Sequence, residues 1–320
     1  MHLSVNPQED LAYQKAILGS VSRTFALTIP LLPPEMEVVV GNTYLLCRIV
    51  DTIEDAVELT PTEKQTLSKL FLDSVLGAAP AESFVAPCLY ALKNHSNTDE
   101  LDLIAHIPTV LRIFHTFPQA NQAAISRCVS IMSDGMTRFH HRQNKDGLKD
   151  LAEFEDYCYV VAGVVGELLT TLFASYSPVF DRRIKGHEAL AIGFGQALQM
   201  TNILKDSPED QARGVNWKPA RLNQSDLLQI ATDKLADSLK YILLIPKNEA
   251  GMRRFCFLAF GLAVMTLGKI ADRSAMFNSS SVKLSRNTVW IFYAFTKVAA
   301  TSDYLVKAFY FVASRRLRQP

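Results

Sequence analysis

The stretch RIVDTIEDA, residues 48–56, carries three acids among residues that are otherwise mostly apolar. If residues 40–56 form a helix, four polar side chains fall on one line at offsets 0, 4, 7 and 11: Tyr44, Arg48, Asp51 and Asp55. Most other positions are apolar, so the sequence predicts a helix that is buried on most sides. Because an uncompensated buried carboxylate is very costly, we expect this polar line to face a polar cavity.

A second apolar stretch, GQALQMTNILKDSPED at residues 195–210, repeats the pattern at offsets 0, 3, 7 and 11: Gln199, Asn202, Asp206 and Asp210. A lone acid pair four residues apart usually marks a solvated face, but two such pairs on apolar helices favour one shared cavity. Carboxylate oxygens suit Mg²⁺ or Mn²⁺, and such ions can clamp a diphosphate and make it a better leaving group. The apolar surroundings suit a hydrocarbon, so the residues predict metal-assisted ionisation of a prenyl diphosphate.

Helical periodicity dominates the rest of the chain, and prolines such as Pro61, Pro87 and Pro178 fall between the expected helices. The helices are expected near residues 8–19, 35–56, 62–75, 100–115, 118–145, 150–175, 181–207, 224–244, 249–272 and 287–315. We find neither alternating strand patterns nor a long linker. The sequence therefore predicts an all-α fold in one domain, residues 1–320.

The composition excludes several classes of protein. A net charge of +1 argues against a nucleic-acid binder. The five scattered cysteines lack metal-site spacing and indicate reduced core thiols in a cytoplasmic protein. The longest charge-free apolar run, residues 255–268, is shorter than the roughly 20 residues that span a bilayer. We therefore expect no transmembrane anchor.

Four segments of the sequence resemble the squalene and phytoene synthase family of head-to-head prenyl transferases. DTIED resembles the first acidic motif of the family and NILKDSPED the second. SRTFALTIPLLP, residues 22–33, resembles its amino-terminal Ser-Arg-Ser-Phe segment, and YCYVVAGVVGELL, residues 157–169, its Tyr-Cys block. The order matches from about residue 15 to about residue 290. The resemblance implies an isoprenoid synthase helical bundle around a central cavity.

The resemblance also implies roles for individual residues. The Mg²⁺ ligands would be Asp51, Glu54, Asp55, Asp206 and Asp210. The substrate-binding residues would be Ser22, Arg23, Thr24, Phe25, Arg48, Gln199, Asn202 and Lys205. Thr24 replaces a commoner serine, and Lys205 replaces a commoner arginine, which keeps the charge but loses the bidentate fork. Tyr157 matches a tyrosine proposed to act on the first carbocation, and Tyr44 and Arg48 complete the catalytic set with Phe255.

Two segments favour squalene synthase within the family. SVKLSRNT, residues 281–288, resembles a stretch whose cations meet nucleotide phosphate, and RFCFLAF, residues 254–260, resembles one that lines the second-step pocket. The implied cofactors are therefore Mg²⁺ and NADPH, with the nucleotide held by Arg23, Arg48, Lys205, Lys283 and Arg286. The implied substrate is farnesyl diphosphate, the product squalene, and the setting sterol or hopanoid biosynthesis. A phytoene, dehydrosqualene or hydroxysqualene synthase without the hydride step, and a non-catalytic assembly protein, are the alternatives.

Two further features lead to expectations. Pro208 lies inside the second acidic motif and removes an intrahelical hydrogen bond, so the sequence predicts a kink or an end between Asp206 and Asp210. Residues 290–310 are rich in aromatic side chains and are followed by basic ones. Such a segment either packs as a final core helix or rests on anionic lipid as a peripheral membrane contact for product release. We expect a monomer.

Overall fold

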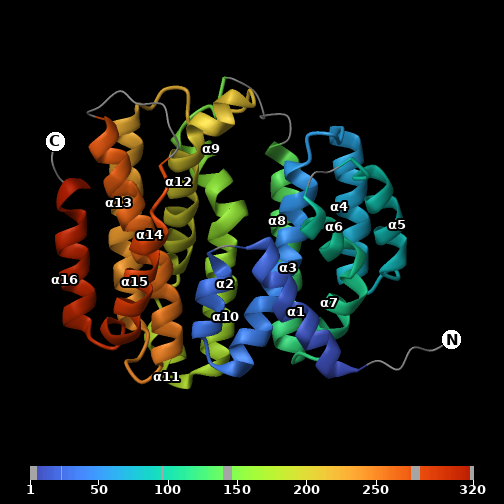
Figure 1. Cartoon of the computed structure of the whole chain (residues 1–320), viewed down its shortest axis with the longest axis horizontal. Helices are drawn as coiled ribbons and strands as arrows, with labels where there is room; N and C mark the ends of the chain where they lie inside the picture. The colour runs from blue at the N-terminus through green and yellow to red at the C-terminus, as the bar shows by residue number, and fades with distance from the viewer. Residues whose placement is uncertain (1–5, 23, 95–96, 140–145, 275–281, 318–320) are drawn as a thin grey trace. The chain divides into compact units, whose positions relative to one another are not determined.

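The computed structural model describes residues 6–22, 24–94, 97–139, 146–274 and 282–317 (Figure 1). It divides into two compact units, Met1–His140 and His141–Pro320. All regular elements in the described ranges are helical, apart from one isolated bridge between Leu148 and Pro219. The predicted all-α fold is confirmed, whereas the single-domain organisation stays a prediction.

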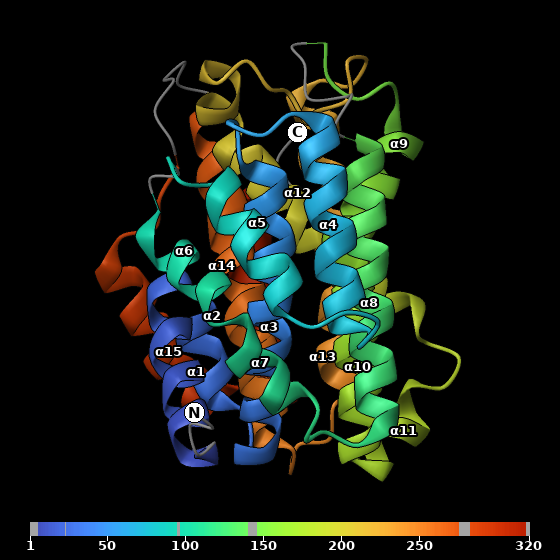
Figure 2. The same ribbon diagram turned by 90° about the vertical axis from the view of Figure 1, so that its right-hand side faces the viewer.

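The first unit is built around α3 (Pro34–Asp55), which packs against five other helices of the unit (Figure 2). Its helices are α1 (Pro7–Val21), α2 (Phe25–Thr28), α3, α4 (Pro61–Val75), α5 (Glu82–Ala91), α6 (Thr98–Ala105), α7 (Ile107–Phe114) and α8 (Gln119–Phe139), with a 3₁₀ turn at Ile29–Leu31. Proline in the first turn starts α3, where the missing N–H costs no bond. A capping box between Thr60 and Glu63 starts α4.

The second unit is built around α12 (Ala189–Ala212), which packs against α9, α10, α13 and α14. Its helices are α9 (Leu151–Cys158), α10 (Val164–Tyr176), α11 (Pro178–Ile184), α12, α13 (Gln224–Leu244), α14 (Ala250–Ser274), α15 (Arg286–Ala299) and α16 (Asp303–Ala313). A π-helical turn, η3 (Tyr159–Gly163), joins α9 to α10, and a 3₁₀ turn, η4, covers Ser314–Leu317. A Cβ on Gly195 would lie 2.1 Å from the Ala162 carbonyl oxygen, so α12 and η3 touch backbone to backbone.

The structure corrects three sequence expectations. Single helices expected over 100–115, 181–207 and 287–315 are each divided in two, because the chain turns near His106, Gly186 and Ser302. Pro87 lies inside the unpredicted helix α5, not between helices. The helix carrying Pro208 does not end there: α12 continues to Ala212, because one lost hydrogen bond near its end is offset by packing against α13 and α14.

Two apolar helical segments in the described ranges have a length and composition that could cross a membrane, Leu151–Tyr176 and Ala250–Asp272. The prediction from the sequence considered only the charge-free run 255–268 and therefore underestimated the length of the second segment. Buried core helices of water-soluble proteins have the same properties, and 72% of the apolar window in Ala250–Asp272 is buried. The two segments are therefore weak support for a membrane span.

Candidate functional site

The predicted polar line of α3 is present in the structure. From Val40 to Ile53 every residue is buried except three: Tyr44, Arg48 and Asp51. Asp55, one turn further along, is exposed. Over residues 40–53 the helix is thus packed on all sides but one, and the accessible strip carries the polar side chains predicted from the sequence.

The amino-terminal segment joins this strip within the first unit. The Tyr44 hydroxyl donates to the Val21 carbonyl oxygen at 3.4 Å, and its ring lies 5.1 Å from the Phe25 ring. Burial raises the pKa of Tyr44, while the Ser22 hydroxyl and the Arg48 charge oppose the rise. Ser22 Oγ also accepts from the Phe25 amide at 3.0 Å. Ser22, Phe25 and Tyr44 therefore meet, with Thr24 exposed beside them; Arg23 lies outside the described residues.

Arg48 makes an ion pair with Glu100 of α6, which the sequence did not select. Burial raises the pKa of Asp51 to about 8, with a further rise from the Asp55 charge, and Arg48 only partly opposes it. The Arg48 Nε atom is buried without a hydrogen-bond partner. The strip therefore holds the Asp51 carboxyl group, whose negative charge is poorly compensated, and the Arg48 guanidinium, whose Nε has a hydrogen to donate.

Glu54 lies apart from the strip, in the packed face of α3. Glu54 is 3% exposed. Burial lowers the pKa of Lys64 on α4, and the Glu54 charge opposes that fall. The Lys64 ammonium donates to the Glu54 carbonyl oxygen. The structure thus places Glu54 beside Lys64, while Asp51 and Asp55 share the accessible strip.

On α12, a cluster forms among three of the selected residues. Lys205 Nζ donates to Asn202 Oδ1 at 3.4 Å and pairs with Asp206 Oδ2 at 3.2 Å. Gln199 is half-buried one turn earlier. The Lys205 ammonium neutralises the Asp206 carboxylate. The cluster of these two residues with Asn202 suits a phosphate group that is bridged by a cation.

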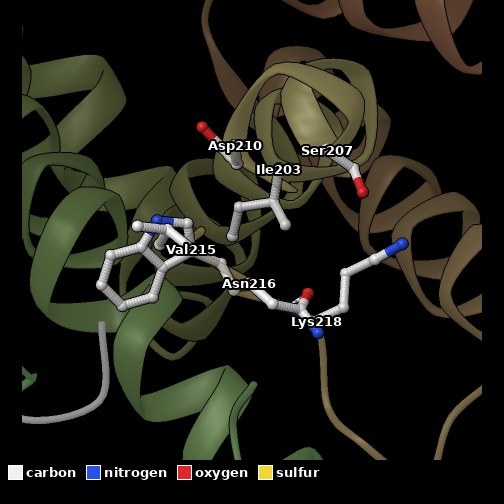
Figure 3. A pocket seen from close by; sticks show the side chains of 7 residues that line it. Ile203, Ser207, Asp210, Val215, Asn216 and Lys218 are labelled. Atoms are coloured by element: carbon white, nitrogen blue, oxygen red, sulfur yellow. Dashed lines mark hydrogen bonds between the residues drawn. The ribbon is translucent and has the colours of Figure 1, made fainter. Parts of the chain in front are cut away.

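Asp210 occupies the next turn and lines an open, shallow hollow that does not enclose space for a water molecule (Figure 3). Arg213 Nη2 donates to Asp210 Oδ1 at 2.6 Å. Burial raises the pKa of Asp210, and the Arg213 hydrogen bond opposes the rise. The other lining residues are Ile203, Ser207, Val215, Asn216, Trp217 and Lys218.

The two aromatic residues selected for catalysis lie in different parts of the second unit. Tyr157 of α9 is 5% exposed and stacks on Trp217, with ring centroids 4.3 Å apart and planes 8° apart. Phe255 of α14 is 4% exposed and meets Phe173 edge-on, at 6.2 Å between centroids. Tyr157 therefore adjoins the Asp210 hollow through Trp217, and Phe255 belongs to the helical core.

Lys283, one of the residues selected for nucleotide binding, lies beside Glu209 near the end of α12. Lys283 Nζ donates to Glu209 Oε1 at 3.2 Å, and Lys269 Nζ donates to the Lys283 carbonyl oxygen at 3.2 Å. Arg286 is exposed in the first turn of α15. Lys283 and Arg286 are exposed cations of the kind that binds nucleotide phosphate, and Lys283 is already paired with Glu209.

The acid pairs fit Mg²⁺ by their donor chemistry. Within the described ranges, no three His, Cys, Asp or Glu side chains converge into a metal cage. Mg²⁺ does not need one, because it usually takes one or two carboxylates together with waters and substrate phosphates. Burial raises the pKa of Asp51 most, and repulsion from Asp55 adds to the rise; a bound cation would offset both effects.

The structure adds residues that the sequence patterns did not identify: Lys64, Glu100, Arg213 and Trp217. Arg213 stands three residues after Asp210, so a search for charge pairs one turn apart could have found it. Glu100 and Trp217 are distant in sequence from the residues they contact, and no local pattern signals them.

Comparisons with known proteins agree with the fold and the motifs. The chain is 32% identical over 207 residues to squalene synthase clz20 of Cochliobolus lunatus, covering 64% of this chain and 46% of that protein. It is 27% identical over 306 residues to a probable squalene synthase of Neurospora crassa, covering 88% and 61%. The match thus spans less than two thirds of either relative.

Solved structures share the fold. A TcSQS structure with a ligand matches at a TM-score of 0.79 and 23% identity, covering 98% of this chain and 92% of that chain. A dehydrosqualene synthase structure matches at 0.61 and 20%, covering 91% and 96%. Residues 18–229 match the squalene/phytoene synthase family, which is more than half of the chain. The chain therefore belongs to the squalene/phytoene synthase family.

Proposed function

We propose that this protein is a squalene synthase. It joins two farnesyl diphosphates head to head into presqualene diphosphate, with loss of one diphosphate and one proton. It then converts presqualene diphosphate to squalene, with loss of the second diphosphate and addition of hydride from NADPH. The observation that carries the proposal is the accessible strip of Tyr44, Arg48 and Asp51 on a helix that is otherwise buried over residues 40–53.

In the first step, the acid pairs Asp51–Asp55 and Asp206–Asp210 would hold Mg²⁺, which supplies the positive charge that draws off diphosphate. Arg48 and Lys205 would bind phosphate oxygens beside them. The Tyr157 ring can stabilise positive charge with its π face, and its hydroxyl can pass a proton. Phe255 would stabilise charge in the second step from the apolar core.

In the second step, NADPH would supply the hydride, with its phosphates held by Lys283 and Arg286, and by Arg23, Arg48 and Lys205. The support for this assignment is that Lys283 and Arg286 carry exposed cationic side chains, with Lys283 beside Glu209 near the end of α12. These residues can bind and orient a nucleotide without a Rossmann loop, and the sequence contains none that follows a strand signal.

Product analysis tests the proposal. Purified protein is incubated with farnesyl diphosphate and Mg²⁺, with and without NADPH, and the hydrocarbons are separated by chromatography. Squalene formed only with NADPH supports the proposal. A product with a central triene in both reactions identifies a dehydrosqualene synthase, and hydroxysqualene identifies water as the quencher. No product in either reaction, from a folded protein that binds no Mg²⁺, identifies a non-catalytic relative.

We also propose that the protein is a cytoplasmic monomer that rests on anionic lipid through α15 and α16. Large apolar side chains are exposed on these helices: Trp290, Ile291, Val298, Tyr304, Phe311 and Val312. Lys297 and Arg315 lie over the rings of Tyr293 and Phe311. Aromatic rings with adjacent cations suit the headgroup region of a bilayer. Flotation with phosphatidylglycerol vesicles, but not with phosphatidylcholine vesicles, is the expected result.

A further inference from the structure

We infer that Trp217 is a positioning residue that fixes the ring of Tyr157 next to the second acidic motif. The inference rests on the proposed function, because it gives Tyr157 a part in the reaction. It assigns a task to a loop residue that neither the acidic motifs nor the Tyr-Cys block contains. It is carried by three features of the second unit: a ring stack, a backbone clamp and a shared hollow.

The ring stack holds the plane of Tyr157. The Trp217 and Tyr157 rings are 4.3 Å apart and nearly parallel at 8°. Tyr157 is 5% exposed, whereas Trp217 is half-buried, so the indole covers a ring that solvent hardly reaches. A stacked aromatic pair gains free energy beyond the area it buries, and it restricts rotation about the Cα–Cβ bond. The direction of the Tyr157 hydroxyl therefore depends on where Trp217 lies.

A backbone clamp holds the Trp217 loop against the segment that leads into the helix of Tyr157. The Leu148 amide donates to the Lys218 carbonyl oxygen at 3.2 Å, and the Ala220 amide donates to the Leu148 carbonyl oxygen at 2.9 Å. Leu148 is fully buried and precedes α9 by three residues. Two hydrogen bonds therefore tie the loop that follows α12 to the segment that leads into α9.

Gly147 makes the clamp possible. Its φ is +76°, a conformation that favours glycine, and an added Cβ would lie 2.3 Å from the Lys218 carbonyl oxygen. The clash would involve backbone, so a rotamer change cannot relieve it. Any side chain at residue 147 would push the loop that carries Trp217 away from α9.

The shared hollow connects this device to the acids. Trp217 lines the hollow together with Asp210 and Ser207; the latter two are labelled in Figure 3. One indole thus touches the tyrosine on one side and borders the hollow of a predicted Mg²⁺ ligand on the other. Trp217 therefore fixes the position of the Tyr157 ring, which would act on the carbocation, relative to Asp210, which would help to bind the diphosphate through Mg²⁺.

The kinetic test uses Trp217→Leu and Trp217→Phe in the full chain. Presqualene diphosphate formation is followed without NADPH, so that only the first step is measured. We expect Trp217→Leu to lower kcat about tenfold while KM for farnesyl diphosphate stays within about twofold, and Trp217→Phe, which keeps a ring, to restore most of the rate. An unchanged kcat in Trp217→Leu overturns the inference.

A double-substitution cycle shows whether Trp217 acts through Tyr157. In a Tyr157→Leu background, Trp217→Leu should lower the residual kcat by less than about twofold, because the ring it positions is gone. An equal tenfold loss in both backgrounds shows that Trp217 acts by another route and overturns the inference.

A spectroscopic test separates this inference from the proposed function. The chain has two tryptophans, so Trp290→Phe leaves Trp217 as the only indole. In that background, Gly147→Ala should shift the Trp217 emission, and Gly186→Ala should not. Gly186 has a φ of +80° but no neighbour within 4 Å of an added Cβ, so it matches the backbone strain without the clash. Near-identical emission from both variants overturns the clamp. A wild-type protein that makes no product refutes the proposed function, and the emission test still decides on the clamp.

Discussion

Arg48 of α3 forms an ion pair with Glu100 of α6, and the Glu100 carboxylate is buried, with the residue 5% exposed. The pair joins the helix of the first acidic motif to a helix that contains no motif residue. Glu100 stands in the first turn of α6, where Asn97 caps the helix and a negative charge is favourable. The position of Arg48, a predicted phosphate-binding residue, thus depends on Glu100, which lies outside the motifs.

Glu100→Gln should destabilise the protein by about 1–3 kcal/mol, because it removes a charged partner from a partly buried guanidinium. The measurement is urea unfolding followed by circular dichroism. Asp99→Asn, an exposed neighbour on the same helix, is the matched control and should change stability by less than about 0.5 kcal/mol. Equal stability of Glu100→Gln and wild type would show that the ion pair contributes nothing.

Asp51→Ala should abolish turnover and leave the fold intact, because it removes a carboxylate of the accessible strip. The metal-free variant should also be more stable than wild type at pH 9. The folded-state pKa of Asp51 is raised to about 8 by burial and by Asp55. A raised carboxyl pKa lowers stability as pH rises from about 4 to about 8, and that loss disappears in the variant. Full activity, or a stability difference that is the same at pH 4 and pH 9, would contradict this prediction.

The fold and most of the candidate site follow from local sequence patterns. The polar lines of α3 and α12 were predictable because a helix places offsets 0, 4, 7 and 11 on one face whatever surrounds it. Helix ends were less predictable: Pro87 and Pro208 lie inside helices because tertiary packing offsets a single lost hydrogen bond.

The contacts that complete the candidate site were not predictable. Glu100 and Trp217 reach Arg48 and Tyr157 only after the chain has folded, across 52 and 60 residues of sequence. Their own neighbours in sequence carry no periodic signal for such a contact. The contact of Lys64 with the Glu54 main-chain carbonyl has the same origin, because it depends on how α4 packs against α3.

Gly195→Ala should destabilise the protein strongly, by about 3 kcal/mol or more, because the new Cβ would lie 2.1 Å from the Ala162 carbonyl oxygen. Gly19→Ala in α1 is the control. An added Cβ there meets nothing within 4 Å, and alanine favours helix, so this variant should gain up to about 1 kcal/mol. Thermal unfolding of the two variants should therefore move in opposite directions. A tolerated Gly195→Ala would mean that α12 and η3 can separate at little cost.

Asp303→Asn should lower stability by about 1 kcal/mol at pH 7 and by much less at pH 3. Burial alone would raise the pKa of Asp303, but hydrogen bonds from Arg253 and Lys247 outweigh it and lower the pKa. A lowered carboxyl pKa contributes stability above the unfolded value of about 3.9, and that contribution is lost as pH falls through the folded value. Urea unfolding at both pH values measures the difference. Asp237→Asn, which removes a surface pair with Lys240, is the control and should show little effect at either pH.

Lys283→Ala should raise KM for NADPH about tenfold and leave presqualene diphosphate formation without NADPH unchanged. The reason is that the Lys283 ammonium would bind nucleotide phosphate but not the prenyl diphosphates. Steady-state kinetics of both steps provides the measurement. Lys240→Ala, an exposed lysine on α13, should change neither step. A loss confined to the first step would assign Lys283 to the prenyl substrate instead.

The π-helical turn Tyr159–Gly163 stands between Tyr157 and the rest of its helical segment. A π turn holds one residue more than the α-helical path it replaces, so it advances the chain by about 100° around the axis. Deleting a single residue from this turn would give an unbroken α-helix and swing the aromatic ring of residue 157 about a quarter of the way round. The direction of the Tyr157 ring is thus set by one extra residue in the turn that follows it, and a change in chain length here would redirect the ring while leaving Tyr157 itself unchanged.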